Sequence, residues 1–258
     1  MTTLKKLLMC LYGILIVFAA MGIQLVVFGM MEYPFILGGR PVTDEVRYLF
    51  SVIGILVCGI IFFLWYRGTV GGEDRISVRR ILGGRNLLWI IALGIGCQFL
   101  VSGLLSLIQP FFDETFSDYN QTIDNLFRGN IIVVVILTVI IAPITEELIF
   151  RGMVMGSLKT VISSLGANIF QAAAFGLYHM NLVQGIYAFI LGLILGSMAL
   201  RFHSVKASIL LHMAVNASAY LLMILPSHNA TLVLTIAIGT ILLVAGLMGL
   251  RERNLIDL

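Results

Sequence analysis

Long apolar runs are the feature of this sequence that most restricts its fold. Eight of them follow one another, near residues 7–31, 47–66, 87–108, 131–150, 167–180, 182–200, 207–225 and 230–250. Most are about 20 residues long, the length that an α-helix needs to cross the hydrocarbon core of a bilayer. Because lipid offers no partners for backbone polar groups, each run is predicted to be a helix. The expected fold is all-α: a polytopic membrane protein with about eight transmembrane helices.

The composition supports an integral membrane protein. The chain is 60% hydrophobic and 11% charged, with a mean hydropathy of +1.06, whereas soluble proteins are about 45–50% apolar and about 25% charged. The net charge of +3 is small, and nucleic acid is not an expected partner. Cys10, Cys58 and Cys97 lie inside apolar runs and are predicted to be buried free thiols.

The basic residues predict the topology. With the N-terminus inside, 13 of the 16 Lys and Arg residues fall on the cytoplasmic side, and only Arg40, Arg47 and Arg128 fall outside. The positive-inside rule therefore favours cytoplasmic termini. The acidic loop 109–130 is expected outside, and the basic, glycine-rich loop 67–86 is expected to connect two spans near lipid headgroups. The first run continues to about Met31, so it is expected to span the bilayer rather than to be a cleaved signal peptide.

Polar residues at helical spacing provide the candidate chemistry. Glu146 and Glu147 follow the apolar run that ends at Ile144, and Arg151 lies four residues after Glu147. Charged residues in a bilayer core cost about 2.5–3.5 kcal/mol, so they are functional by default. Residues four apart share a helix face, so Glu147 and Arg151 are predicted to pair. Glu146 lies about 100° around the helix and is the candidate for active chemistry.

Two further pairs have the same spacing. Phe175 and His179 lie four residues apart, as do His212 and Asn216. A break near 163–166 would fold the chain into a helical hairpin with Glu146 facing His179. Counted from Ala167, His179 lies about 18 Å along its span, too far toward the outside unless the hairpin tip projects into the cytoplasm. Irregular backbone is therefore expected around 180–185, where it could line a water-filled cavity.

A carboxylate, two imidazoles and an amide are suited to hydrolysis. Glu146 could take a proton from water with His179 orienting that water, and His212 and Asn216 could stabilise an oxyanion. Alternatively, Glu146, His179 and His212 could bind zinc or another divalent metal and leave a position for water. Spacing does not separate the two schemes. The sequence contains neither H-E-x-x-H nor G-x-S-x-G, the motifs typical of zinc proteases and serine hydrolases.

The motifs resemble those of the CPBP family of intramembrane proteases, also called the CAAX-protease and bacteriocin-processing (Abi) family. The matching positions are Glu146-Glu147 with Arg151, Phe175 with His179, and His212 with Asn216. The resemblance implies an eight-helix membrane protease that cleaves a peptide bond near the cytoplasmic face. Such families are catalogued as metalloproteases, while a second scheme has the first glutamate activate water directly. Family members trim prenylated CAAX proteins or act on small peptides.

The expected organisation follows from these motifs. Residues 1–130 would form N-terminal transmembrane helices, about three spans with their loops, and 131–250 the catalytic transmembrane core. The expected partners are the bilayer and a peptide or protein substrate, either lipidated or membrane-associated, and the expected location is a bacterial cell membrane. Glu147, Arg151 and Phe175 would support the site. His203 is expected at the membrane interface, and neither His203 nor His228 is expected in the site.

Two other functions fit the same residues. A non-catalytic bacteriocin-immunity or regulatory membrane protein could bind a peptide in the same pocket. A proton-coupled carrier would also use buried Glu and His residues, although carriers often contain internal repeats and no convincing repeat is found. Two glycine pairs, Gly152 with Gly156 and Gly192 with Gly196, follow the small-xxx-small pattern that predicts close helix packing.

Overall fold

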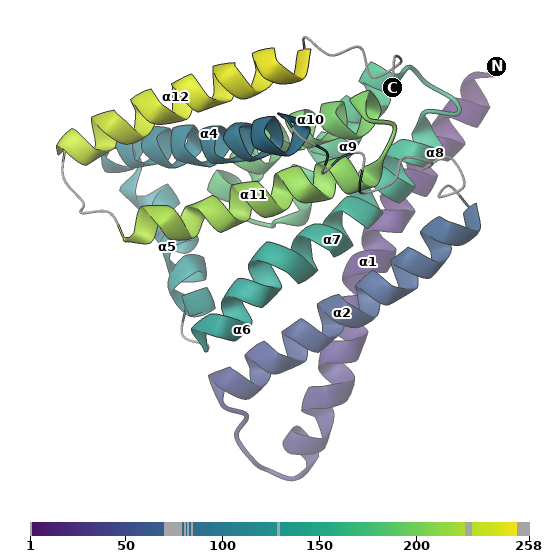
Figure 1. The fold of residues 1–258 in the computed structure, drawn as a ribbon. Coiled ribbons are helices and arrows are strands. Elements are labelled where there is room, and N and C mark those ends of the chain that lie inside the picture. Colours follow the sequence, from purple (N-terminus) through teal and green to yellow (C-terminus); the bar gives the residue numbers. More distant parts are fainter. Residues whose placement is uncertain are drawn as a thin grey trace.

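The structure is a computed structural model, and it describes residues 2–69, 79, 81, 83, 85–127, 130–224 and 229–251. These ranges contain helices and no strand, which confirms the all-α prediction (Figure 1). The elements are α1 Thr3–Leu37, α2 Asp44–Thr69, α4 Arg85–Ile108, η2 Gln109–Phe111, α5 Asp113–Phe127, α6 Ile131–Ile136, η3 Leu137–Ile141, α7 Ala142–Glu147, η4 Leu148–Met155, α8 Gly156–Leu158, α9 Ser164–Tyr178, α10 Leu182–Arg201, α11 Val205–Met223 and α12 Asn229–Arg251.

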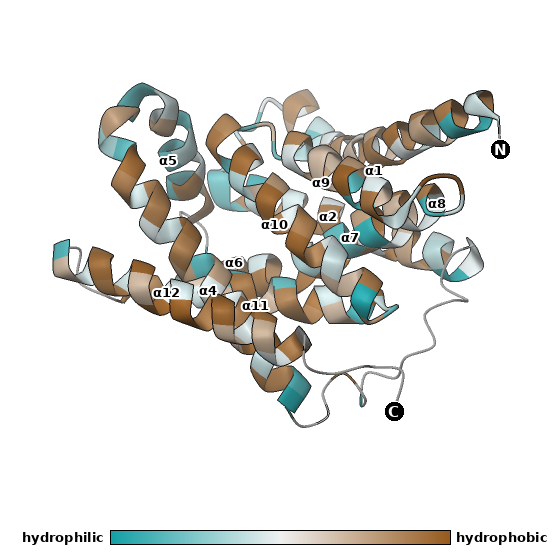
Figure 2. Cartoon of the chain, turned by 90° about the horizontal axis from the view of Figure 1, so that it is seen from above, coloured by the Kyte–Doolittle hydropathy of each residue, from teal (hydrophilic) through white to brown (hydrophobic). Residues whose placement is uncertain are grey.

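Seven of the predicted spans are long and apolar enough to cross a membrane. They are Thr3–Leu37, Asp44–Thr69, Arg85–Phe111, Ile131–Leu158, Leu182–Arg201, Val205–Met223 and Asn229–Leu250. The remaining predicted span, 167–180, is α9, whose 15 residues extend about 22 Å, less than the hydrocarbon core of about 30 Å. Apolar residues dominate these helices (Figure 2), and many of their large apolar side chains are exposed, as lipid contact requires. The chain is therefore an integral, multi-pass membrane protein.

The span that carries the two glutamates is one long helix with irregular hydrogen bonding. It runs through α6, η3, α7, η4 and α8, and both η3 and η4 are π-helical. Such i→i+5 segments are rare and occur frequently at functional sites. The apolar run predicted that this helix ends at residue 150, but in the structure the helix ends at Leu158. The predicted position of Glu146 near a helix end is therefore wrong, because α7 lies within the span.

A hairpin connects this helix to α9, as predicted. The turn follows Leu158, and Ser163 caps α9 by accepting a hydrogen bond from the Gly166 backbone N–H at 3.1 Å. The irregular backbone expected over 180–185 is shorter than predicted. It is confined to residues 179–181, where Met180 has a φ of 54°, and α10 begins at Leu182 because the Asn181 side chain caps it.

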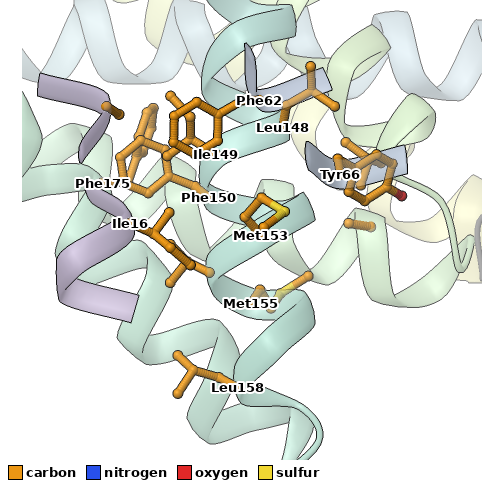
Figure 3. Close-up of a cluster of buried hydrophobic side chains, with 14 of the residues drawn as sticks. Ile16, Phe62, Tyr66, Leu148, Ile149, Phe150, Met153, Met155, Leu158 and Phe175 are labelled. Carbon is orange, nitrogen blue, oxygen red and sulfur yellow. The ribbon is translucent and has the colours of Figure 1, made fainter. Parts of the chain in front are cut away.

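Two apolar clusters hold the helices together. One contains Phe62 of α2, Phe150 and Met153 of η4, and Phe175 of α9, all fully buried (Figure 3). The other joins α4 to α10, α11 and the end of α12. The cysteines are free, as predicted; Cys58 and Cys97 are buried, whereas Cys10 is half-buried. No observation tests the division at residue 130, which stays a prediction.

The acidic segment that was predicted as an outer loop contains a helix, α5. Its residues are mostly exposed, but Phe116 is buried. Tyr119 lies edge-on to Tyr187 of α10, with ring centroids 6.2 Å apart. Burial raises the pKa of the Tyr119 hydroxyl, and its hydrogen bond with Tyr187 opposes that rise. At neutral pH this contact is therefore made by an uncharged phenol.

Candidate active site

A buried ion pair lies at the centre of the polar cluster. The Glu147 Oε1 atom is 2.7 Å from Arg151 Nη1, and both side chains are 0% exposed. The Arg151 Nη2 atom donates to the Gly192 carbonyl at 3.2 Å, and the guanidinium lies 4.5 Å from the centroid of the Phe175 ring. The predicted pairing of Glu147 with Arg151 is thus confirmed. A carboxylate, a carbonyl and an aromatic face together compensate the buried cation.

His212 contacts both adjacent glutamates. Its Nδ1 atom is 2.8 Å from Glu147 Oε1, and its Nε2 atom is 3.8 Å from Glu146 Oε2. Because an ionised carboxylate can only accept, Nδ1 carries the hydrogen and Glu147 fixes the orientation of the ring. The Nε2 atom therefore faces Glu146. The two glutamates differ in environment as well, since the Glu146 side chain is 18% exposed and that of Glu147 is 0% exposed.

His179 is oriented by the backbone of its own helix. Its Nδ1 atom donates to the Phe175 carbonyl at 2.8 Å, because a carbonyl can only accept. The Nε2 atom is then the ring nitrogen that this bond leaves for another partner. The Phe175 ring meets His179 edge-on at 4.8 Å and His212 at 5.9 Å between centroids. Phe175 was predicted to support the site, and the structure places its ring between the two imidazoles and against Arg151.

The lengths of the helices bring Glu146 and His179 to similar depths. The depth of each residue can be measured along its helix from the turn between α8 and α9. The stretch 146–158 is about 18 Å long and the stretch 164–179 about 22 Å, at about 1.5 Å per residue. His179 was expected to lie too far toward the outside to face Glu146. The two residues instead lie at similar depths, because the first helix of the hairpin is longer than predicted.

Asn216 forms a hydrogen bond with the backbone of a neighbouring helix rather than with the other motif residues. Its Nδ2 atom donates to the Thr138 carbonyl at 2.8 Å. Pro143 explains why this carbonyl is available. In a π-helical segment the carbonyl of residue 138 would accept from the N–H of residue 143, five positions later, and proline has no N–H. The amide nitrogen has two hydrogens, so a second donor remains. Thr138 also shares a hydrogen bond of 2.7 Å with the Tyr220 hydroxyl.

A second layer of polar residues supports Arg151. These residues were not among the site residues predicted from the sequence. Gln171 Nε2 donates to the Gly192 carbonyl at 2.9 Å, the same oxygen that Arg151 uses, and to Asn168 Oδ1 at 2.7 Å. Both side chains belong to buried residues in an apolar helix, which is a signal the sequence contained. Close packing at Gly192 and Gly196 is confirmed: a Cβ at Gly192 would lie 3.0 Å from Ala172 Cα.

The geometry does not form a three-ligand metal site. Across the residues that the structure describes, no three His, Cys, Asp or Glu side chains are grouped to hold one ion. Glu146, His179 and His212 are thus not gathered as a ligand set in this structure. Metal binding by these residues stays a prediction. His203 lies outside the cluster at the α10–α11 turn, and His228 lies outside the described residues.

The fold and the site define a class: a polytopic helical membrane protein with a buried carboxylate–imidazole cluster where the hairpin meets α10 and α11. Residues 128–218, which contain every motif position, match the family model described as "Type II CAAX prenyl endopeptidase Rce1-like". The predicted resemblance to the CPBP or CAAX protease family is thereby supported over these residues.

A curated relative covers more of the chain. The sequence is 24% identical over 197 residues, 74% of this chain and 80% of the relative, to a Bacillus subtilis (strain 168) protein named "Putative membrane peptidase YdiL". No solved structure matches the chain. The family and this relative support a membrane protease with a peptide or protein substrate.

Proposed function

We propose that this chain is an intramembrane endopeptidase in which Glu146 activates water for attack on a peptide bond. The observation that carries the proposal is the asymmetry of the adjacent glutamates. Glu147 is held by Arg151 and His212 at 2.7 and 2.8 Å. Glu146 is partly exposed, and among the described residues no cation forms a hydrogen bond with it. A general base must be reachable by water and free to accept a proton.

The remaining residues supply the other parts of a hydrolytic reaction. The free Nε2 of His179 accepts a hydrogen bond from the attacking water and orients it. As Glu146 removes a proton, the water oxygen bonds to the substrate carbonyl carbon, and the second N–H of Asn216 donates to the oxyanion. The proton passes through the Nε2 atom of His212, which faces Glu146, to the leaving amine as the C–N bond breaks. Glu147 stabilises the imidazolium from the Nδ1 side.

The substrate that fits best is a membrane-bound peptide, because the cluster lies within the spans. The family description names a prenyl endopeptidase, so a C-terminal prenyl group on that peptide is part of the proposal. The orientation with both termini in the cytoplasm also stays a proposal, as does a bacterial cell membrane. Comparing one reconstituted peptide with and without a prenyl group decides whether the lipid is required.

The test is cleavage of reconstituted peptides by wild type and Glu146→Gln, with products identified by mass spectrometry. Removing a general base lowers the rate by about 10²–10⁴-fold. Glu114→Gln, an exposed substitution in α5, is the matched control and should cleave like the wild type. Unchanged cleavage by Glu146→Gln would overturn its assignment. Peptide binding without cleavage would favour an immunity or regulatory protein, and transport driven by a pH gradient would favour a carrier.

A further inference from the structure

A pocket lies near the α8 end of the long helix, and it shares Arg151 with the polar cluster described above. Its volume is about 80 Å³, and its lining comes from the turn after α8 and from the turn between α10 and α11. A single water needs about 10–15 Å³ of such space, so the pocket admits a small polyatomic ion. Figure 1 shows the end of α8 and the start of α11 at the same end of the molecule.

The lining of this pocket is basic. Arg151 is 1% exposed, and its Nε atom is buried without a hydrogen-bond partner among the described residues. Lys159 is half-buried and His203 is exposed, so they form the outer lining above a buried arginine. No Asp or Glu is among the described lining residues. An unused guanidinium donor below two basic side chains favours an anion.

The start of α11 adds to this preference. Ser204 and Val205 line the pocket, and α11 continues from Val205 for 19 residues. The Lys206 N–H of this turn donates to Ser204 Oγ and the Ser204 N–H to the Ala199 carbonyl. The helix start therefore contributes the positive end of its dipole, which favours anions.

The backbone of His203 is held in an uncommon conformation. Its φ is 47°, and it follows α10 at the position where glycine is usual. The His203 N–H donates to the Leu200 carbonyl and the Ser204 N–H to the Ala199 carbonyl, at 3.3 and 3.1 Å, the bonds of a Schellman helix end. A left-handed non-glycine residue is a reason to look for function, and here its side chain lines the pocket.

The position of the pocket predicts that it lies near phospholipid headgroups. Both turns that form it follow the ends of candidate spans, Ile131–Leu158 and Leu182–Arg201. Basic residues at such positions meet the anionic surface of a membrane. We infer that the pocket between Arg151, Lys159 and His203 binds a phosphate group, supplied by the headgroup of an anionic phospholipid. This inference does not depend on proteolysis, since binding can be measured without a substrate.

The experiment measures phosphate and lipid binding separately. Thermal unfolding of the delipidated protein in detergent is followed with sodium phosphate and, at equal ionic strength, sodium chloride. Native mass spectrometry then compares retention of phosphatidylglycerol and phosphatidylcholine. Lys159→Gln and His203→Gly remove ligands, and Lys6→Gln removes an exposed charge elsewhere. Glycine accepts a positive φ freely, so His203→Gly should fold at least as stably as the wild type.

Phosphate should raise the melting temperature of the wild type more than chloride does. Each pocket variant should weaken the apparent phosphate affinity about tenfold, as expected for loss of one charge-assisted hydrogen bond, while Lys6→Gln should match the wild type. Equal effects of phosphate and chloride, or equal losses in all three variants, would overturn the site. Preferential retention of phosphatidylglycerol that Lys159→Gln abolishes supports the headgroup source, and absence of that preference overturns it.

Discussion

The imidazole of His212 and the carboxylate of Glu147 share a hydrogen bond of 2.8 Å although 65 residues separate them in the chain. The same carboxylate oxygen is 2.7 Å from Arg151. One buried oxygen therefore connects the hairpin helix to α11 and fixes which nitrogen of His212 faces Glu146. The two glutamates are adjacent in sequence, but the Glu147 side chain is fully buried in these contacts and that of Glu146 is partly exposed.

Replacing Glu147 by Gln should destabilise the protein by about 3–5 kcal/mol, because it leaves the buried Arg151 without its counter-charge. Glu146→Gln should change stability by less than about 1 kcal/mol, because that side chain is partly exposed and its contact with His212 is long, at 3.8 Å. Unfolding of both variants in detergent measures the difference. Equal losses of stability would contradict the asymmetry.

Asn216→Ala should lower the cleavage rate by about 10²–10³-fold, as expected for loss of an oxyanion donor. It should also cost about 1 kcal/mol of stability, because the Thr138 carbonyl loses its partner.

The double variant Pro143→Ala with Asn216→Ala separates these two effects. Residue 143 would regain a backbone N–H for the Thr138 carbonyl, so stability should recover while cleavage stays low. Recovery of cleavage in this variant would show that Asn216 acts only on the fold. A double-mutant cycle of unfolding free energies measures the coupling.

Gly196→Ala should destabilise the protein by about 1–3 kcal/mol through overpacking. A Cβ there would lie 1.9 Å from Asn168 Oδ1 and 2.6 Å from Gln171 Nε2, which would displace the amides that support the Gly192 carbonyl. Gly22→Ala in α1 is the control, because nothing lies within 4 Å of the added Cβ. Similar stability of the two variants would argue against this packing.

Chelation should leave peptide cleavage unchanged within about twofold, because hydrolysis based on Glu146 as general base requires no ion. The assay compares purified enzyme before and after dialysis against a chelator, with metal content measured in parallel. Loss of activity that added zinc restores would replace this scheme with the metal-bound one, in which Glu146, His179 and His212 are the expected ligands.

The helices were predictable because apolar length and helical spacing are local properties. The run that begins at Ile131 and the four-residue spacing of Glu147 and Arg151 predicted a span and an ion pair, and the structure contains both. The polar helix α5 was missed because its 15 residues have little net hydrophobicity, and a search for apolar runs does not detect such a segment.

The contacts within the site could not be predicted from spacing alone. The bond between His212 and Glu147 depends on how α11 crosses the hairpin, which no local pattern encodes. The first helix of the hairpin continues to Leu158, beyond the apolar run, and this continuation sets the depth of Glu146. Pro143 was visible in the sequence, but its effect on Thr138 and Asn216 requires the register of two helices.

The unequal lengths of the helices have a consequence for the surrounding lipid. The 35 residues of α1 extend about 52 Å, and the 15 residues of α9 about 22 Å. A helix as long as α1 tilts in the bilayer, and α9, which is too short to cross the hydrocarbon core, leaves room for the lipid beside it to become thinner. Such thinning beside α9 would shorten the path of water to His179 at its end. Cleavage should therefore be faster in bilayers of short-chain lipids than in bilayers of long-chain lipids, and reconstitution across a series of chain lengths measures this dependence.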